Sequence, residues 1–522
     1  MSKQRALVWF KRDLRVHDHA ALFAAQAHDD AFGLFIIEPE WLQSQECDAS
    51  HVDFALQCVA ELRGALAARG MPLLVRVGTA VPVLAQLHQE LAYTHLLSHE
   101  ETGSGWSYAR DLQVAAWCTA NRIAWQEFTQ TGVVRRLRSR SGWAQRWQAR
   151  MDAPLHVLQK GFTAATGLAQ PELPTLAHLG LTAHGKSLQA AGEKAARHTL
   201  TTFLQERGFD YRKALSSPLS AEDGCSRLSP HLAFGTLSLR TVHQATEVAI
   251  RKTPERSLAY ALRGFAGRLR WHCHFMQKLE DEPRIEFQNF ARVCDGLREN
   301  DFNDAHFAAW CEGRTGYPMV DACMRSLRAT GWLNFRMRAM LVSFASYHLW
   351  LHWRPTGVFL ARQFLDFEPG IHWSQMQMQS GTTGINTLRM YSPTKQAVDQ
   401  DPEGLFIRRW VPELARVPLP YLAQPWKMEE SVQRMVGCIV GVDYPLPIVD
   451  EKEALKTAKD RMYGLRKTEQ AREESNAVQA RHGSRKSGLP PSGQRRKAAP
   501  ARSGISASRT PAAPSPQGDL FN

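Results

Sequence analysis

The sequence predicts two domains of different class: an α/β N-terminal domain built on a doubly wound parallel sheet, and an all-α C-terminal domain. Within the first 130 residues, short apolar runs alternate with segments of helical period. From about residue 193 to 414, nearly all apolar residues recur with helical spacing. The chain has 522 residues, which is long enough for two or three domains with full cores.

Five short apolar runs are typical of buried strands, and they lie at residues 6–10, 32–37, 73–77, 94–98 and 123–128. Helical patterns separate them, at residues 20–27, 51–68, 81–91 and 106–121. Strands that are apolar on both faces and joined by helix-length crossovers are typical of a parallel sheet covered by helices on both sides. The strand order stays open at this point.

Changes in composition predict the remaining boundaries. We expect an N-terminal domain over residues 1–132, an Arg- and Pro-containing connector over 133–195, a helical domain over 196–470 and a tail over 471–522. The tail loses apolar periodicity and is rich in Ser, Ala, Pro, Gly and Arg. We therefore expect it to be disordered.

The net charge of +13 is concentrated at the C-terminal end. Residues 481–522 contain eight Lys or Arg and one acid, which leaves a mildly basic body. This distribution favours a polyanionic partner such as nucleic acid. The alternative is a tail that only improves solubility.

Other classes are disfavoured by what the chain lacks. No run reaches 18 apolar residues, and the apolar run near the N-terminus is too short for a signal peptide. The nine cysteines are scattered without a C-x-x-C pair, which is typical of reduced thiols rather than a metal set. We expect a cytoplasmic, monomeric protein with no metal and no membrane contact.

The segment at residues 313–353 carries the strongest functional signal. Two apolar helical patterns flank a turn, and Trp332, Arg336 and Arg338 follow it. Buried guanidinium groups need partners. The first candidate partner of Arg338 is Asp366, in LDFEPG.

Four motifs, in this order along the chain, resemble those of the photolyase/cryptochrome family. They are WFKRDLRVHDHAAL at 9–22, DGCSRLSPHLAFGTLS at 223–238, GYPMVDA with GWLNFRMR and LDFEPG at 316–370, and SPTKQ with DPEGLFIRRWVPEL at 392–414. The resemblance covers nearly everything from residue 5 to about 465. It implies an FAD-binding helical domain and an antenna chromophore, of folate or deazaflavin type, in the N-terminal domain.

The resemblance also implies which residues contact FAD. Tyr211, in FDYRKA, would close over the phosphates, and Arg338 with Asp366 would flank the isoalloxazine ring, with Asn334 and Glu368 as further polar contacts. A hydroxyl-rich turn would hold the pyrophosphate through backbone N–H groups. That turn consists of Cys225, Ser226, Arg227, Leu228 and Ser229. The alternatives are a plain helix cap for the turn and a structural salt bridge for the ion pair.

For DNA, the resemblance implies that Trp271, in RLRWHCHF, stacks on flipped pyrimidines of UV-damaged DNA. Stacking of this type contributes about 1–3 kcal/mol per base. The alternative is an ordinary core tryptophan. Further candidate DNA contacts are Arg268, His272, Arg336 and Arg389.

Three positions near the implied active site depart from the family pattern. Arg268 stands where dimer photolyases usually carry a glutamate, and His272 stands where they carry an arginine. An ungapped count from Asp366 places His372 opposite the flavin N5, as a candidate catalytic and cofactor-binding residue, and the alternative is that a gap in the match puts a neighbouring residue there. A histidine there would be a proton donor or a pH-sensitive switch.

The tryptophan relay that reduces the flavin in the family is also altered. Trp353 matches the middle member, but Met376 replaces the tryptophan nearest the flavin and Asn300 replaces the outermost one. Methionine does not readily pass an electron. The flavin is then reduced either by outside donors or through another aromatic residue, for which the candidates are Trp350, Trp373 and Tyr391.

Two functions from different classes follow. The first is an FAD-dependent DNA photolyase of an atypical bacterial branch, which repairs UV-induced pyrimidine dimers by light-driven electron transfer. The second is a cryptochrome-like photoreceptor that binds FAD without repair. The departures favour the receptor, while the basic tail favours repair, and we expect repair. A dark FAD redox protein is a third alternative.

Two further hypotheses concern a loop of the N-terminal domain and the C-terminal tip of the chain. Glu100 and Glu101 lie where some family members hold a folate, although an exposed loop is the alternative. The C-terminal QGDLFN resembles the peptide with which bacterial repair proteins bind the DNA sliding clamp, although so short a match also arises by chance. The implied contacts are Gln517, Asp519, Leu520 and Phe521.

Overall fold

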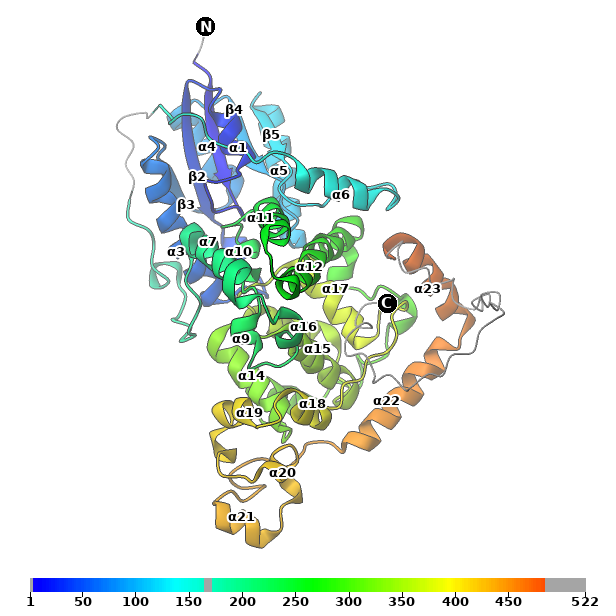
Figure 1. Cartoon of the computed structure of the whole chain (residues 1–522). Coiled ribbons are helices and arrows are strands. Elements are labelled where there is room, and N and C mark those ends of the chain that lie inside the picture. The colour runs from blue at the N-terminus through cyan, green and yellow to red at the C-terminus, as the bar shows by residue number, and fades with distance from the viewer. Residues whose placement is uncertain (1–2, 164–170, 484–522) are drawn as a thin grey trace, which may run out of the picture.

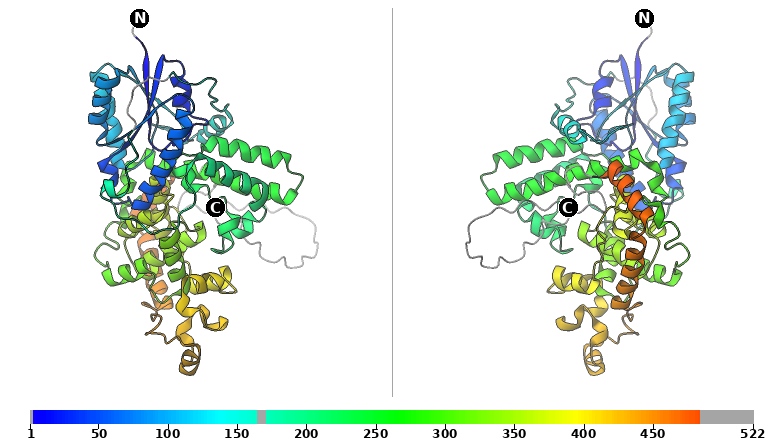
Figure 2. Two further views of the ribbon diagram at one scale, coloured as in Figure 1. Left: turned by 90° about the vertical axis from the view of Figure 1, so that its left-hand side faces the viewer. Right: turned by 90° about the vertical axis from the view of Figure 1, so that its right-hand side faces the viewer.

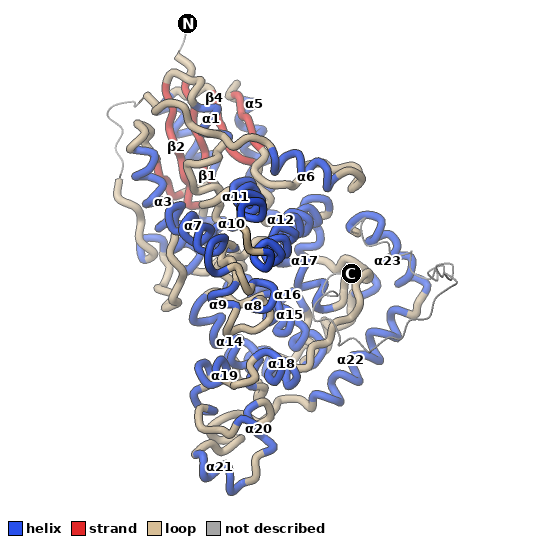
Figure 3. Tube along the Cα trace, in the orientation of Figure 1, coloured by secondary structure: helices blue, strands red, loops and turns tan. Residues whose placement is uncertain are grey.

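The computed structural model describes residues 3–163 and 171–483. An α/β domain forms one end of the molecule and a larger helical domain forms the other (Figure 1). Figure 3 shows that the strands are confined to the first domain. This agrees with the predicted change from an α/β to an all-α pattern along the chain. No helix in the described ranges is both long enough and apolar enough to cross a membrane.

The sheet has five parallel strands: β1 (Arg5–Phe10), β2 (Asp30–Ile37), β3 (Leu73–Val77), β4 (His95–His99) and β5 (Ala124–Phe128). Their order is β3-β2-β1-β4-β5. Each predicted strand is present, and no end differs by more than two residues. The direction of winding reverses between β1 and β4, and in sheets of this kind ligands bind at the strand ends beside that point.

Helices cover both faces of the sheet, namely α1 (Ala20–Ala25), α2 (Pro39–Leu42) and α3 (Ala49–Ala67), and then α4 (Ala80–Leu91) and α5 (Gly105–Ala120). Neighbouring residues of β1 enter different cores. Val8 packs in the core with α1 and α3, and Trp9 packs in the core with α4 and α5. The doubly wound arrangement is therefore confirmed.

The connector contains α6 (Trp143–Asp152) and a short 3-10 turn, η1 (Ala177–Leu179). Its described part runs along the outside of the N-terminal domain. Leu158, Phe162 and Leu176 pack there against the core beside α3. The connector therefore covers the sheet domain as well as joining the two domains.

The helical domain starts at α7 (Gly192–Thr202) and surrounds one large apolar core. Its other α-helices are α8 (Tyr211–Ala214), α9 (Ala221–Gly224), α10 (Ser229–Ala233), α11 (Leu239–Lys252), α12 (Arg256–Asp281), α13 (Asp304–Glu312), α14 (Pro318–Thr330), α15 (Phe335–Ser343), α16 (Trp353–Gln363), α17 (Pro369–Ser380), α18 (Pro393–Gln400), α19 (Leu405–Trp410), α20 (Leu419–Leu422), α21 (Glu430–Val436), α22 (Glu451–Arg466) and α23 (Glu469–His482). Short helical turns join them: η2 (Phe203–Arg207), η3 (Pro283–Glu286), η4 (Arg292–Cys294), η5 (Phe344–His348), η6 (Pro412–Leu414) and η7 (Pro425–Lys427).

The prediction of a disordered tail from residue 471 is wrong for its first part, because α23 extends to His482. Thr468 caps this helix by accepting a hydrogen bond from the backbone N–H of Ala471. Val478 packs against Phe290 and two other apolar side chains of the helical domain. Figure 2 shows the C-terminal helices lying along the flank of that domain. Residues 484–522 lie outside the described ranges, and they include the residues of the sliding-clamp hypothesis.

Candidate functional site

The predicted pair of Arg338 and Asp366 is present and lies between α15 and the turn before α17. Nη1 and Nη2 of Arg338 donate to Oδ1 and Oδ2 of Asp366, each at 2.9 Å, and Nε donates to the carbonyl of Leu333 at 2.7 Å. Burial alone would raise the pKa of Asp366, but the Arg338 guanidinium holds it below its ordinary value. The result is a fixed ion pair with bidentate geometry.

A cavity lies against this pair. Its lining residues come from α15, the turn at 364–368 and α17, and they include Phe335, Arg338, Asp366, Phe367, Glu368, His372, Gln375, Met376 and Gln379. Three buried polar atoms of this lining have no protein partner: Glu368 Oε1, Gln375 Nε2 and Gln379 Oε1. Buried polar atoms are nearly always hydrogen-bonded. Free acceptors and a free donor beside apolar walls fit a planar ring with carbonyl and N–H edges, as in a flavin, and we call this candidate site the flavin cavity.

His372 lies in this cavity, but its chemistry differs from the prediction. Its Nε2 lies 2.8 Å from the carbonyl oxygen of Gly357, so this nitrogen carries the proton and donates. Burial lowers the pKa of His372 to about 3. The neutral ring therefore presents only an accepting Nδ1 to the cavity. The interpretation as a proton donor or pH-sensitive switch is not supported by this geometry.

The predicted phosphate turn at residues 225–229 is held open by one arginine. The Arg207 guanidinium donates to the carbonyls of Asp223, Cys225 and Ser226, at 2.8, 2.6 and 3.3 Å. Within the turn, the backbone N–H of Leu228 donates to the Ser226 hydroxyl at 3.4 Å. The backbone N–H of Cys225 donates to the carbonyl of Ala221 at 3.1 Å, so the N–H groups of Ser226, Arg227 and Ser229 are those left for a ligand.

This turn also reaches the ion pair. Arg227 has a φ of +60°, in the left-handed region, and its guanidinium lies 3.9 Å from the ring centroid of Trp332. The hydroxyl of Ser229 hydrogen-bonds to Asp366. The structure thus brings the predicted phosphate turn and the predicted ring site together, which are more than 100 residues apart in the sequence.

Tyr211 and Asn334 lie on the elements that join these parts. Tyr211 is buried at the start of α8, with its ring 5.8 Å from that of Phe265 in α12. Asn334 Nδ2 donates to the carbonyls of Leu215 and Ser216, at 3.0 and 2.9 Å. Its Oδ1 is buried without a protein partner. Asn334 therefore fixes α8 against α15 and keeps one acceptor for a ligand.

Among the candidate DNA contacts, Arg268 and Trp271 lie one turn apart on α12. The Arg268 guanidinium is 5.6 Å from the ring of Phe335, which itself lines the flavin cavity. Trp271 is half-buried, so part of its surface is open to solvent. This side of α12 therefore adjoins the flavin cavity. Arg336 lies on α15 and Arg389 lies in the segment after α17, both half-buried.

His272 is placed differently from this group. It lines a small cavity between the domains, together with Arg12, Glu100 and Glu368. Burial lowers its pKa to about 4, so it is neutral. The structure therefore turns His272 toward the N-terminal domain, away from the position expected of a DNA contact.

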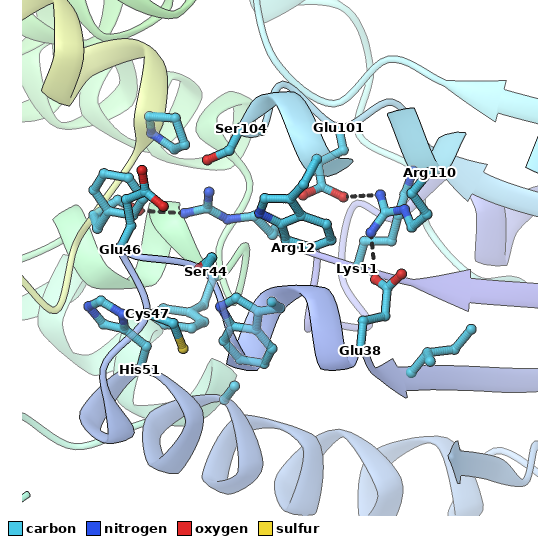
Figure 4. Close-up of a pocket in the computed structure, with 18 of the residues that line it drawn as sticks. Lys11, Arg12, Glu38, Ser44, Glu46, Cys47, His51, Glu101, Ser104 and Arg110 are labelled. Carbon is cyan, nitrogen blue, oxygen red and sulfur yellow. Dashed lines mark hydrogen bonds and ion pairs between the residues drawn. The ribbon is translucent and has the colours of Figure 1, made fainter. Parts of the chain in front are cut away.

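A second large cavity lies at the carboxyl ends of the strands, where the winding of the sheet reverses (Figure 4). It is lined by Trp9, Lys11, Arg12, Glu38, Trp41, Glu46, Cys47, His51, Glu101, Ser104, Trp106 and Arg110, and by Phe234, Leu365, Phe367 and Pro369 of the helical domain. Of the two residues proposed for an antenna, Glu101 is here, while Glu100 lines the neighbouring interdomain cavity. Most of this site was missed, although polar residues directly after apolar strands were a usable signal.

Arg110 organises the charges of this N-terminal cavity. Its Nη1 donates to Glu38 and its Nη2 to Glu101, each at 2.6 Å. The guanidinium also lies 4.9 Å from the ring of Trp9 and 5.4 Å from that of Trp106. Arg110 also binds Asp111 at 2.8 Å, so one guanidinium is shared among three acids, and Glu38 Oε1 stays buried without a protein partner. The two indole rings form walls of the cavity.

The two cavities share a wall. Phe367 lines both of them. The Arg12 guanidinium, from the N-terminal domain, donates to the carbonyl of Phe367 at 2.7 Å and to that of Ala233 at 2.9 Å, and lies 3.5 Å from Glu368. The turn that carries Asp366 is therefore fixed by a residue of the other domain.

The relay positions are resolved as well. Trp353 is fully buried at the start of α16, Met376 lines the flavin cavity, and Asn300 is exposed. The inner and outer positions of the predicted relay, Met376 and Asn300, therefore carry no aromatic side chain.

One group of metal-ligating residue types is buried in the N-terminal domain. His99 Nδ1 lies 2.7 Å and His19 Nε2 lies 3.0 Å from the same carboxylate oxygen of Asp13. His19 Nδ1 accepts from the backbone N–H of Leu22, so its proton is on Nε2, facing Asp13. Both imidazole nitrogens thus lie close to the same carboxylate oxygen.

Comparison with known proteins identifies both domains. Residues 6–144 match the family model described as DNA photolyase, and residues 265–464 match that described as the FAD binding domain of DNA photolyase. The helical domain is therefore an FAD-binding domain.

Among curated proteins, a deoxyribodipyrimidine photo-lyase of Streptomyces griseus is 30% identical over 469 residues, which cover 86% of this chain and 97% of that protein. A cryptochrome DASH of Gloeobacter violaceus is 29% identical over 486 residues, covering 86% and 94%. A crystal structure of a bacterial class III photolyase from Agrobacterium tumefaciens superposes with a TM-score of 0.78 at 25% identity, covering 90% and 99%. The chain belongs to the photolyase/cryptochrome family.

Proposed function

We propose that the protein is an FAD-dependent DNA photolyase that repairs UV-induced pyrimidine dimers under blue or near-ultraviolet light. One observation carries the proposal: Phe335 lines the flavin cavity and also contacts Arg268, one turn from the half-buried Trp271. A flipped base stacked on Trp271 would therefore lie close to the flavin ring. The basic tail supports a nucleic-acid partner.

Bound FAD supplies the light absorption and the electron that splits the dimer. The protein side chains hold and orient the cofactor and the DNA. Arg338 and Asp366 fix the ring edge, and the turn at 225–229 takes the pyrophosphate. Trp271 stacks on the damaged bases, while Arg268 and Arg336 contact phosphates. Met376, Phe335 and Phe367 exclude water from the ring.

The N-terminal cavity is proposed to hold a second chromophore. Its tryptophan walls suit a planar ring, and the carboxylates of Glu38 and Glu101 accept hydrogen bonds from ring N–H or amino groups. A solved archaeal photolyase from Sulfolobus tokodaii, similar in fold, is described as having two FAD molecules, with the implication of a novel light-harvesting cofactor. The shared wall at Phe367 would bring the two rings close, which favours energy transfer.

The test is direct repair. The purified protein is chemically reduced and illuminated with oligonucleotides that contain a cyclobutane dimer or a (6-4) product, in single- and double-stranded form. Restored thymines are measured by chromatography. Restoration for either lesion supports the proposal, and none for either, with FAD bound, refutes it.

The second candidate is a cryptochrome-like receptor. The specific observation is the altered surroundings of the flavin: a neutral His372, an arginine at 268, and no tryptophan at position 376. A receptor would bind FAD and change state in light, yet restore no thymines in the assay above.

A further inference from the structure

Two tryptophans lie in contact behind the flavin cavity. Trp353 of α16 and Trp373 of α17 are both fully buried, with ring centroids 6.0 Å apart and planes inclined at 66°. Gly357 permits this approach, because a Cβ there would lie 2.7 Å from the Trp373 ring and 3.3 Å from Met376. The glycine thus brings α16 close enough to α17 for the indoles to meet.

Trp373 reaches the wall of the flavin cavity. Its ring lies 4.8 Å from that of His372 and 6.2 Å from that of Phe367, and both residues line the cavity. It also precedes Met376 by one helical turn, so the two side chains share a face of α17. Trp373 therefore places an indole beside Met376, the position at which the family resemblance implies a tryptophan.

The two indoles have different electrostatic surroundings. The Arg354 guanidinium lies 4.1 Å from the ring centroid of Trp373, where a positive charge opposes loss of an electron, and Glu46 at 3.1 Å offsets only part of that charge. Trp353 Nε1 donates to Asn289 Oδ1 at 2.7 Å, and that oxygen stabilises positive charge on the indole. A missing electron is therefore more stable on Trp353 than on Trp373.

We propose that Trp373 passes an electron to the flavin ring and that Trp353 refills it, so that these two residues form the relay of this chain. One electron leaves Trp373 for light-excited, oxidised FAD, and one electron moves from Trp353 to Trp373. Trp353 is then oxidised by one electron. Because Trp353 is buried, a soluble thiol at the protein surface supplies the replacement electron by transfer through the intervening protein. No bond breaks in the protein. This inference rests on the flavin photochemistry of the proposed function.

The other aromatic candidates fit less well. Trp350 lies under two guanidinium groups, those of Arg298 at 4.5 Å and Arg461 at 4.9 Å, and it does not line the flavin cavity. Tyr391 is half-buried after α17 and is also absent from the cavity lining. The ring contacts of Trp353 and Trp373 form the shorter path.

The test uses Trp373→Phe and Trp353→Phe, with Trp350→Phe and Tyr391→Phe as matched controls. Oxidised, FAD-loaded protein is illuminated with excess thiol, and flavin reduction, flavin fluorescence lifetime and the transient tryptophan radical are followed by absorption and emission. We expect Trp373→Phe to lengthen the fluorescence lifetime. The two relay variants should photoreduce flavin at similar rates, and both should be far slower than the two control variants.

Three outcomes separate the possibilities. Normal photoreduction in Trp373→Phe, or its loss in a control variant, overturns the relay. If Trp373→Phe lacks FAD, Arg354→Met tests the same idea without opening the core, and an unchanged radical lifetime there also overturns it. Chemically reduced Trp373→Phe should repair dimers like the unmodified protein, so absence of repair in both would count against the proposed function and leave the relay standing.

Discussion

The two cavities on either side of Phe367 differ in how their charges are balanced. In the N-terminal cavity, Arg110 binds both Glu38 and Glu101, and one buried polar atom of the lining, Glu38 Oε1, has no protein partner. In the flavin cavity, Glu368 and two glutamine side chains keep three buried polar atoms without protein partners. The second site therefore depends more on a ligand than the first. We expect FAD to be structural as well as catalytic, and the second chromophore to contribute little to stability.

The largest effect is expected from Asp366→Ala, which removes half of the ion pair and a contact to FAD. The Arg338 side chain is a quarter exposed, so the loss of its carboxylate partner costs about 2 kcal/mol. Flavin content should fall to background, with a matching loss in unfolding free energy measured in urea. Glu413→Gln is the control, because it breaks the more exposed pair with Arg325 and should cost less than about 1 kcal/mol. Equal effects would contradict the comparison.

Removal of FAD is expected to have the next largest effect. A ligand at a thousandfold excess over its Kd stabilises the folded state by about 4 kcal/mol. Thermal unfolding of the apoprotein should therefore occur at clearly lower temperature than that of the reconstituted protein. Preparations that contain FAD but differ in second chromophore should unfold alike. A larger shift from the second chromophore than from FAD would reverse the assignment of the two cavities.

A smaller effect is expected from Glu368→Gln. Burial raises the pKa of Glu368 from 4.5 to about 7. The folded state then holds this proton more tightly than the unfolded state, so the apoprotein loses stability as pH rises from about 4.5 to 7. The substitution should remove up to about 3 kcal/mol of that loss.

The measurement is urea unfolding at pH 5 and pH 8. Other buried acids raised to about 7, such as Glu280 and Glu286, should preserve part of the pH dependence. Glu430→Gln, at an exposed position, is the control and should leave it unchanged. A Glu368→Gln variant with the full pH dependence would show that this carboxyl is charged in the fold.

Removal of residues 517–522 should leave the ligand content of both cavities unchanged. If Gln517, Asp519, Leu520 and Phe521 bind the sliding clamp, truncation abolishes co-purification with the clamp and leaves flavin content unchanged. The basic segment before them would act through effective concentration on DNA. Retained clamp binding in the truncated protein would end that hypothesis.

Sequence reasoning was most successful where a pattern is local. The strands were found because buried parallel strands are continuously apolar, and Arg338 with Asp366 because their motifs are short. Glu101 was named from the sequence, but Glu38 and Arg110 beside it were missed. These side chains come together from separate strand ends, and the sheet order that joins them is not readable from the sequence. His372 was misinterpreted because its partner, Gly357, depends on how α16 packs on α17. Helix α23 was missed because its sequence is polar on nearly every side.

Arg12 limits how this protein can be divided. It comes directly after the first strand, yet its guanidinium satisfies the carbonyls of Ala233 and Phe367 in the other domain. A helical domain expressed alone would lose the donor to both oxygens and would release the turn before α17. The two domains are therefore not exchangeable modules, and a chimera with a relative's α/β domain should keep its flavin only if that relative also has an arginine at this position.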